Sequence, residues 1–150
     1  QFEGRTIGST AVGLAVSDGH YGCFWAGDSR ALRVRGGRIE RLTRDHSLVQ
    51  DLIDAGMLKE EEAEGHPQAN VITRAVGVHA RLRVDKVSGE VEAGDIFLLA
   101  SDGLTRVVSE DEIRAELLCA SPDAAADRLI ELSLERGAPD NVSLVIVRAT

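Results

Sequence analysis

Residues 94–104, GDIFLLASDGL, pass from a run of apolar residues directly into an Asp-Gly pair. The run itself, residues 96–100, has the length and composition of a buried strand. Asp102 therefore stands at the end of a strand, where its carboxylate either reaches water or points inward. An inward carboxylate without a partner costs free energy, so the neighbours of Asp102 decide what it does.

Two other aspartates stand beside apolar runs of the same kind. Asp28 follows YGCFWAG (residues 21–27), and Asp140 precedes Asn141 and the run VSLVIV (residues 142–147). Taken singly, each fits a turn, a helix cap or a surface ion pair. Taken together, three carboxylates next to the most apolar segments could converge on one hard cation held by oxygen ligands.

The first 43 residues are predicted to form an antiparallel meander of short strands. Asp18-Gly19 lies between the first two runs and is typical of a two-residue type I′ hairpin turn. Gly36-Gly37 separates the next two runs in the same way. The predicted strands are 10–17, 20–26, 32–34 and 39–42.

The pattern then changes to helix, returns to strand and becomes helical again. Asp45 or Ser47 can cap a helix over 48–55 that Gly56 ends. Capping residues before Asp111 and Pro122 indicate two later helices. Antiparallel strands followed by clustered helices predict one α+β domain of sheet and helix layers over residues 1–150. The further predicted elements are a helix over 59–64, strands over 82–91, 95–101 and 142–147, and helices over 111–119 and 122–136.

Composition excludes several classes of protein. The chain has 150 residues, 43% hydrophobic and 28% charged, which is typical of a globular protein. Seventeen basic against 25 acidic residues give a net charge of −8, without the basic stripe that a nucleic-acid binder needs. No apolar run approaches the ~20 residues of a membrane span, and residues 1–10 do not resemble a signal peptide. We therefore expect no nucleic-acid partner, no membrane and a cytoplasmic location.

Six segments, in order, resemble the metal-dependent serine/threonine protein phosphatases, the type 2C or PPM family. The resemblance covers nearly all 150 residues, and the segment from Asp45 to Gly77 looks like the bacterial branch in particular. The six segments are GSTA (8–11), AGDSRALR (26–33), LTRDHS (42–47), VITRAVG (71–77), GDIFLLASDGL (94–104) and APDNVSLVIV (138–147).

The resemblance implies an antiparallel β-sandwich flanked by helices, with a metal centre at one end. Asp102 and Asp140 match acids that bind the first catalytic metal, and Asp28 matches an acid that shares a third, weaker metal with Asp102. Gly103 and Asn141 are expected to support these ligands without binding the metal. Residues 44–80, with His46, His66 and Arg74, look like the flap that controls access to the site.

The implied activity is hydrolysis of phosphoserine and phosphothreonine in proteins. Carboxylates at strand ends suit Mn²⁺ or Mg²⁺, two to three ions in a complete domain, and leave water on the metal. Such ions activate water directly, so no nucleophilic side chain is expected. Phosphorylated proteins, among them a bacterial serine/threonine kinase, are the expected partners.

The resemblance also predicts an upstream segment that these 150 residues lack. That segment carries a phosphate-binding Arg, a metal-binding acid and a D-G-x-G-G motif whose Asp bridges two metals. We therefore expect an N-terminally truncated domain, inactive alone, that self-associates through exposed apolar surface and strand edges. The alternative is a non-catalytic module with this fold that binds a phosphoprotein or a kinase.

Overall fold

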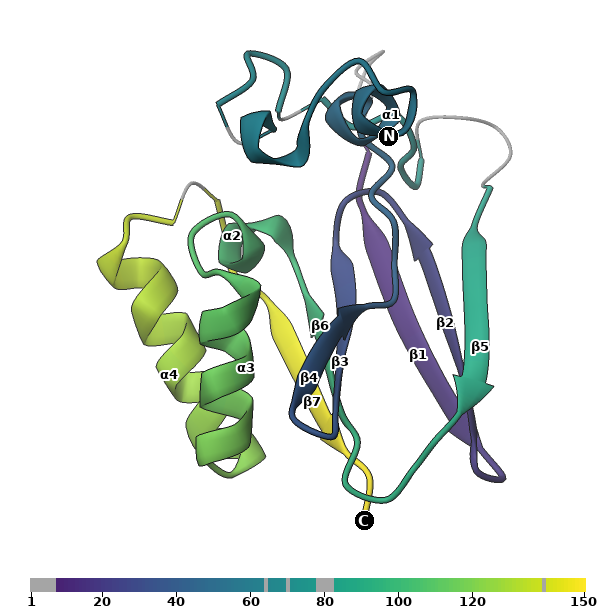
Figure 1. The fold of residues 1–150 in the computed structure, drawn as a ribbon, viewed down its shortest axis with the longest axis vertical. Helices are drawn as coiled ribbons and strands as arrows, with labels where there is room; N and C mark the ends of the chain where they lie inside the picture. The colour runs from purple at the N-terminus through teal and green to yellow at the C-terminus, as the bar shows by residue number, and fades with distance from the viewer. Residues whose placement is uncertain (1–7, 64, 70, 78–82, 139) are drawn as a thin grey trace.

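Two antiparallel sheets face each other in the computed structural model, which describes residues 8–63, 65–69, 71–77, 83–138 and 140–150. Helices cover the outer face of one sheet, and a helix-containing segment lies across one end of the sandwich (Figure 1). This confirms the predicted α+β sandwich. The strands are β1 (Ala11–Ser17), β2 (His20–Ala26), β3 (Arg30–Arg35), β4 (Arg38–Arg41), β5 (Asp85–Glu90), β6 (Ile96–Ala100) and β7 (Leu144–Arg148).

The helices follow their predicted capping residues. Ser47 caps α1 by accepting the Gln50 N–H, Ser109 forms a capping box with Glu112, and Ser121 caps a helix that begins at Pro122. The predicted helix over 59–64 is a single 3₁₀ turn, η1, in its described part. The helices are α1 (Leu48–Asp54), η1 (Glu60–Glu62), α2 (Asp102–Thr105), α3 (Glu110–Cys119) and α4 (Pro122–Glu135).

The predicted meander is wrong, because the first four strands belong to two different sheets. Strands β1 and β2 pair with β5 in the order β1-β2-β5, whereas β3 and β4 join β6 and β7 in the order β4-β3-β6-β7. The two predicted hairpins are confirmed, since Ser17 pairs with His20 and Arg35 with Arg38. Hairpin signals are local and do not report which sheet the next strand will join.

The chain crosses from one sheet to the other at residues 27–29. Gly27 has φ +113°, and a Cβ on it would lie 2.5 Å from Thr10 Cγ2. Only a residue without a side chain turns the backbone here against Thr10. The Thr10 and Ser29 hydroxyls, 2.7 Å apart, hold the other side of the crossing.

The larger core lies between the second sheet and the helices. Side chains on alternate positions of β3 and β6 point toward α2, α3 and α4, as the two-residue period of a strand requires. Leu98, Leu104, Ile113 and Leu129 are fully buried in this core. The helix layer is therefore fixed to the strand that leads into Asp102.

The smaller core lies between the two sheets. Cys23 and Trp25 of β2 meet Ala31 of β3, and the rings of Tyr21 and Phe97 lie 5.2 Å apart. Arg33 also lies here, with its guanidinium 5.9 Å from the centre of the Tyr21 ring. One face of β3 and β6 thus packs into the core beside the helices, and the opposite face packs into the core between the sheets.

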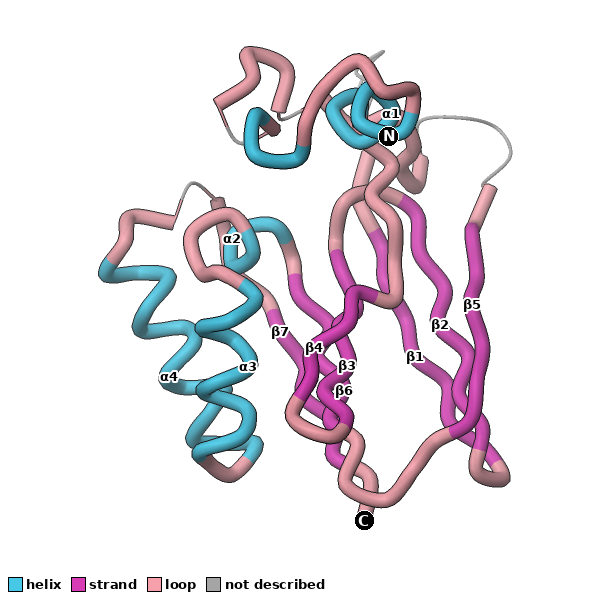
Figure 2. The backbone as a smooth tube through the Cα atoms, viewed as in Figure 1, coloured by secondary structure: helices cyan, strands magenta, loops and turns pink. Residues whose placement is uncertain are grey.

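The segment that resembles a flap links β4 of one sheet to β5 of the other. It consists of α1, η1 and connecting loops, and it lies across the end of the sandwich near α2 (Figure 2). Parts of three predictions lie outside the described residues. They are the helix end at Glu64, the strand start at Leu82 and flap positions 64, 70 and 78–80. Within the described residues, no helix has the length and hydropathy needed to span a membrane.

Candidate functional site

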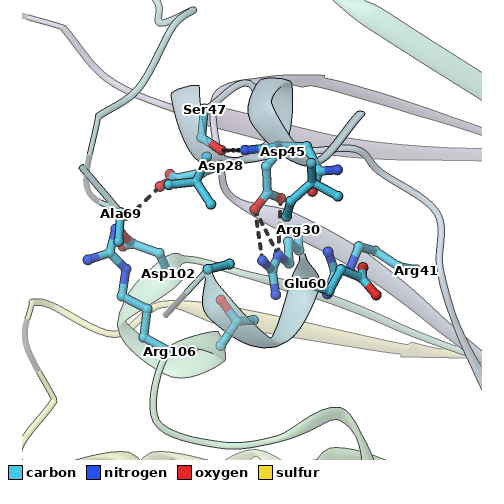
Figure 3. Close-up of a pocket in the computed structure, with 14 residues that line it drawn as sticks. Asp28, Arg30, Arg41, Asp45, Ser47, Glu60, Ala69, Asp102 and Arg106 are labelled. Atoms are coloured by element: carbon cyan, nitrogen blue, oxygen red, sulfur yellow. Dashed lines mark hydrogen bonds and ion pairs between the residues drawn. The ribbon is translucent and has the colours of Figure 1, made fainter. Parts of the chain in front are cut away.

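A pocket of about 510 Å³ lies between the flap and the end of the second sheet. Its walls come from four places in the sequence: the crossing at Asp28, strands β3 and β4, the flap and α2. Charged side chains dominate the walls (Figure 3). The lining residues are Asp28, Arg30, Arg41, Asp45, Ser47, Val49, Gln50, Ile53, Glu60, Ala63, Ala69, Asp102, Thr105 and Arg106.

Asp28 is fixed by the crossing between the sheets. The Gly27 N–H donates to His46 Nδ1 at 2.9 Å, and the His46 N–H donates to the Gly27 carbonyl at 2.8 Å. This reciprocal pair connects the residue before Asp28 to the base of the flap. Asp28 is 7% exposed, so its carboxylate is held in a largely desolvated position.

Asp102 enters the same pocket from the first position of α2. The short helix starts where β6 ends, and Ser101 precedes it in extended conformation. Arg106 lies one turn later, and its side chain contacts Asp102 with Nη2 3.0 Å from Oδ2. The spacing of four residues places both side chains on one face of the turn.

Asp28 and Asp102 share the Arg106 guanidinium. The same Nη2 atom lies 3.7 Å from Asp28 Oδ2. Burial, together with the smaller effects of the Asp102 and Asp45 charges, raises the pKa of Asp28 to about 6, and Arg106 opposes the shift. One guanidinium therefore does not fully compensate two carboxylates in this desolvated position.

The other arginines of the pocket have carboxylate partners of their own. Arg30 binds Asp45 through two nitrogens, with Nε 3.0 Å from Oδ1 and Nη2 2.8 Å from Oδ2. Arg41 Nη2 lies 3.6 Å from Glu110 Oε2 at the start of α3. Arg30 is thereby oriented by a bidentate pair, the geometry that restricts a guanidinium most.

Asp140 lies beside α2 rather than in the pocket wall. A Cβ on Gly103 would lie 2.2 Å from the Asn141 carbonyl oxygen and 3.1 Å from that of Asp140, so only glycine lets the two segments approach. The Asn141 N–H donates to Asp140 Oδ1 at 2.7 Å. The structure thus brings the Asp140 backbone next to Asp102, but the Asp140 side chain is exposed and does not line the pocket.

The three flap residues singled out in the sequence, His46, His66 and Arg74, do not line the pocket. His46 Nε2 lies 2.8 Å from Asp85 Oδ2, and Arg74 Nη1 donates to Asp85 Oδ1 at 3.0 Å. These bonds lower the pKa of Asp85. His46 and Arg74 therefore connect the flap to β5, while His66 accepts the Gln68 N–H within the flap.

Sequence reasoning missed several residues that form the pocket. Arg106 carried a usable signal, because it follows Asp102 by four residues, the spacing at which two side chains meet on one helical turn. Arg30 gave no signal of its partner, because Asp45 lies 15 residues away along the chain. Gln50 and Ile53 of α1 gave no signal, since their role depends on where the flap lies.

The donor set of the pocket fits a hard divalent cation. Asp28 and Asp102 supply carboxylate oxygens from two separate elements to one cation position, and Mg²⁺ or Mn²⁺ accepts such ligands together with water. Within the described residues, no group of three or more His, Cys, Asp or Glu side chains is arranged as a metal site. The pocket thus offers part of a coordination sphere.

The sequence is similar to that of bacterial protein phosphatases, although no family model matches it. Protein phosphatase PhpP of Streptococcus pneumoniae is 39% identical over 144 residues, which are 95% of this chain and 58% of that protein. Serine/threonine protein phosphatase PstP of Mycobacterium tuberculosis is 38% identical over 140 residues, 93% of this chain and 27% of that protein. The chain thus spans less than two thirds of these relatives.

The fold is similar to that of solved phosphatases. The serine/threonine phosphatase of S. agalactiae superposes with a TM-score of 0.93 at 35% identity, covering 100% of this chain and 62% of that one. The catalytic domain of PstP in complex with two manganese ions gives a TM-score of 0.84 at 36% identity, covering 93% and 57%.

Proposed function

Because this chain belongs to the metal-dependent serine/threonine protein phosphatases of type 2C, we propose that its pocket is part of a site that hydrolyses phosphoserine and phosphothreonine in proteins. One observation carries the proposal: Asp28 and Asp102, from separate elements, meet at a single cation position. Structural carboxylates need no such convergence, because each can be satisfied by a local turn or cap.

Asp28 and Asp102 are proposed to bind Mn²⁺ or Mg²⁺ in the pocket. When bound, a divalent ion lowers the pKa of a water and neutralises phosphoryl oxygens. Asp140 is proposed as a further ligand, supported by the approach of its backbone to Gly103. Gly103 allows that approach, and the Asn141 N–H orients the Asp140 carboxylate.

The cations of the pocket wall suit the substrate. Arg30 is held in one orientation by Asp45, and Arg41 lies on the neighbouring strand. Guanidinium groups in such positions attract and orient a phosphate. Ser47 and Gln50, at the start of α1, offer polar groups for the peptide that carries it.

Phosphorylated proteins, including a bacterial serine/threonine kinase, are the proposed substrates. This chain spans 58% of the length of PhpP, and a complete centre of two to three ions is proposed to need acids from the upstream part of the phosphatase domain. The 150 residues alone are then expected to turn over little substrate. The flap, residues 44–80, is proposed to control access to the pocket, because α1 and η1 form one of its walls.

Hydrolysis of a phosphothreonine peptide tests this function. We would compare this chain with a longer chain that carries the upstream acids, each with Mn²⁺ and with a chelator. The longer chain is expected to hydrolyse the peptide only with Mn²⁺, and Asp102→Asn is expected to lower kcat at least about 100-fold, since a charge-stabilising group is lost. Asp18→Asn, in the exposed β1-β2 turn, is the matched control.

Two outcomes would contradict the proposal. If turnover persists with the chelator, or in the Asp102→Asn variant, the reaction does not depend on a metal bound by Asp102. Metal-independent binding of the phosphopeptide without any turnover by the longer chain would favour a non-catalytic binding module.

A further inference from the structure

Arg106 places a positive charge at the position where the divalent cation is proposed to bind. Its Nη2 atom lies 3.0 Å from Asp102 Oδ2 and 3.7 Å from Asp28 Oδ2. Figure 3 shows the Arg106 side chain extending from α2 toward both carboxylates. A guanidinium and a metal ion cannot both occupy that position, because like charges a few ångströms apart repel strongly in a desolvated pocket.

The turn of α2 brings Arg106 within reach of Asp102. The Arg106 N–H donates to the Asp102 carbonyl at 3.0 Å and closes the turn of α2. The side chain then returns along the same face to the Asp102 carboxylate.

The other two arginines of the pocket bind carboxylates elsewhere. Arg30 is bound by Asp45, and Arg41 faces Glu110. In the part of the chain that the structure describes, Arg106 is therefore the arginine that contacts both Asp28 and Asp102.

The charges in the pocket favour a divalent ion over the guanidinium. Arg106 supplies one positive charge to two carboxylates, whereas Mn²⁺ or Mg²⁺ supplies two. The Arg106 side chain is 29% exposed, compared with 9% for Asp28, so it can move into water while Asp28 stays in place. A long charged side chain at the rim of a pocket keeps its solvation when it swings outward.

We propose that Arg106 is an internal competitor of the divalent cation, whose guanidinium must leave Asp28 and Asp102 before one ion can bind both carboxylates. This inference rests on the proposed function, since the ion is the one proposed for that site. Arg106 thereby raises the concentration of free metal at which the site fills. In the metal-free chain it balances part of the negative charge of the two carboxylates.

Direct measurement of Mn²⁺ binding tests the inference without any enzymatic assay. Titration calorimetry, or the electron paramagnetic resonance signal of free Mn²⁺, would compare the 150-residue chain with Arg106→Met. Methionine keeps an unbranched side chain, removes the charge and offers no oxygen ligand. We expect Arg106→Met to bind Mn²⁺ about tenfold more tightly, a difference of ~1.4 kcal/mol. Arg106→Lys, which keeps the charge, is expected to stay much closer to wild type.

The matched control is Arg136→Met. It also removes one positive charge close to α2, but Arg136 pairs with Glu112 and donates to the Val107 carbonyl. Circular dichroism and urea unfolding establish that each variant is folded. In the double variant Asp28→Asn, Arg106→Met the gain in affinity should disappear, because one of the two ligands is gone.

The outcomes separate the inference from the function on which it rests. If wild type binds Mn²⁺ through Asp28 and Asp102 but Arg106→Met binds it no more tightly, the competitor role is wrong and the metal site stands. An equal gain in Arg136→Met would assign the effect to net charge and also overturn the role. If neither the 150-residue chain nor the longer chain that carries the upstream acids binds Mn²⁺ in a manner sensitive to Asp28→Asn and Asp102→Asn, both proposals fall.

Discussion

The carboxyl group of Asp28 makes the folded chain less stable when it is ionised. Its pKa is raised from 3.8 to about 6, mainly by burial. Between these pH values the folded protein holds a proton that the unfolded chain releases, so the free energy of unfolding falls as pH rises from about 4 to about 6. Below about pH 4 the ionisation of Asp28 does not lower the free energy of unfolding, and above about pH 6 it lowers it by the full amount.

Asp28→Asn should therefore stabilise the metal-free chain at neutral pH. Asparagine has nearly the same shape and carries no charge, so we expect a gain of ~2 kcal/mol at pH 8 that shrinks toward zero near pH 4. Urea unfolding in the presence of a chelator at the two pH values measures the difference. Asp18→Asn, on an exposed turn, should show no comparable gain at pH 8; an Asp28→Asn gain of equal size at both pH values would contradict the ionisation argument.

At the scale of the elements, the contact between α2 and the loop before β7 depends on the absence of a side chain at Gly103. Gly103 has no side chain, and the carbonyl oxygens of residues 140 and 141 occupy the space that a Cβ would need. Ser101 and Ser143 reinforce the contact, since the Ser101 N–H donates to the Ser143 carbonyl at 2.9 Å and the Ser143 N–H to Ser101 Oγ at 3.0 Å. Backbone therefore packs directly on backbone here.

Gly103→Ala should lower the free energy of unfolding by about 1–3 kcal/mol, because the added methyl group forces backbone apart in a closely packed contact. Urea unfolding of the purified variant measures the change. Gly13→Ala is the matched control, since a Cβ on Gly13 meets nothing within 4 Å. A Gly103→Ala variant as stable as Gly13→Ala would mean that the loop adapts freely and does not fix Asp140 beside Asp102.

Element positions followed from the sequence where their causes are local. Serine caps, Pro122 at the first position of α4 and the two glycine hairpins each act within a few residues, so their predictions were confirmed. The separation of β2 from β3 into two sheets depends on Gly27 meeting Thr10, a contact that no local pattern reports. Asp28 and Asp102 were singled out from their strand ends and the resemblance, and their role as metal ligands stays a prediction. The pocket that they line together with α1 was not predicted, because it depends on where the flap lies.

At the scale of the whole molecule, the helix layer covers only one of the two sheets. The outer face of β1-β2-β5 has no helix against it in the described residues (Figure 1). Phe24 lies on this sheet with 42% of its surface exposed, and it borders a shallow apolar pocket with Val84. We propose that this face lets the chain self-associate, because contiguous exposed apolar surface favours association.

The weight-average mass of the chain should rise with concentration in sedimentation equilibrium. Phe24→Lys should weaken that rise, because it places a charge within the apolar surface. The control is Leu134→Lys, which makes the same kind of change on an exposed position of α4. A uniform monomer at high concentration would contradict self-association, and equal effects of both variants would place it elsewhere on the molecule.

The flap carries the chain from β4 to β5, and so it divides the strands of each sheet into an earlier and a later group. The earlier segment contributes β1 and β2 to one sheet and β3 and β4 to the other, while the later segment contributes β5 to the first and β6 and β7 to the second. Neither segment contains all the strands of either sheet. The two segments are joined by the strand pairs β2-β5 and β3-β6. A protease that cuts the flap would leave two interlocked polypeptides that migrate as one particle until a denaturant separates them.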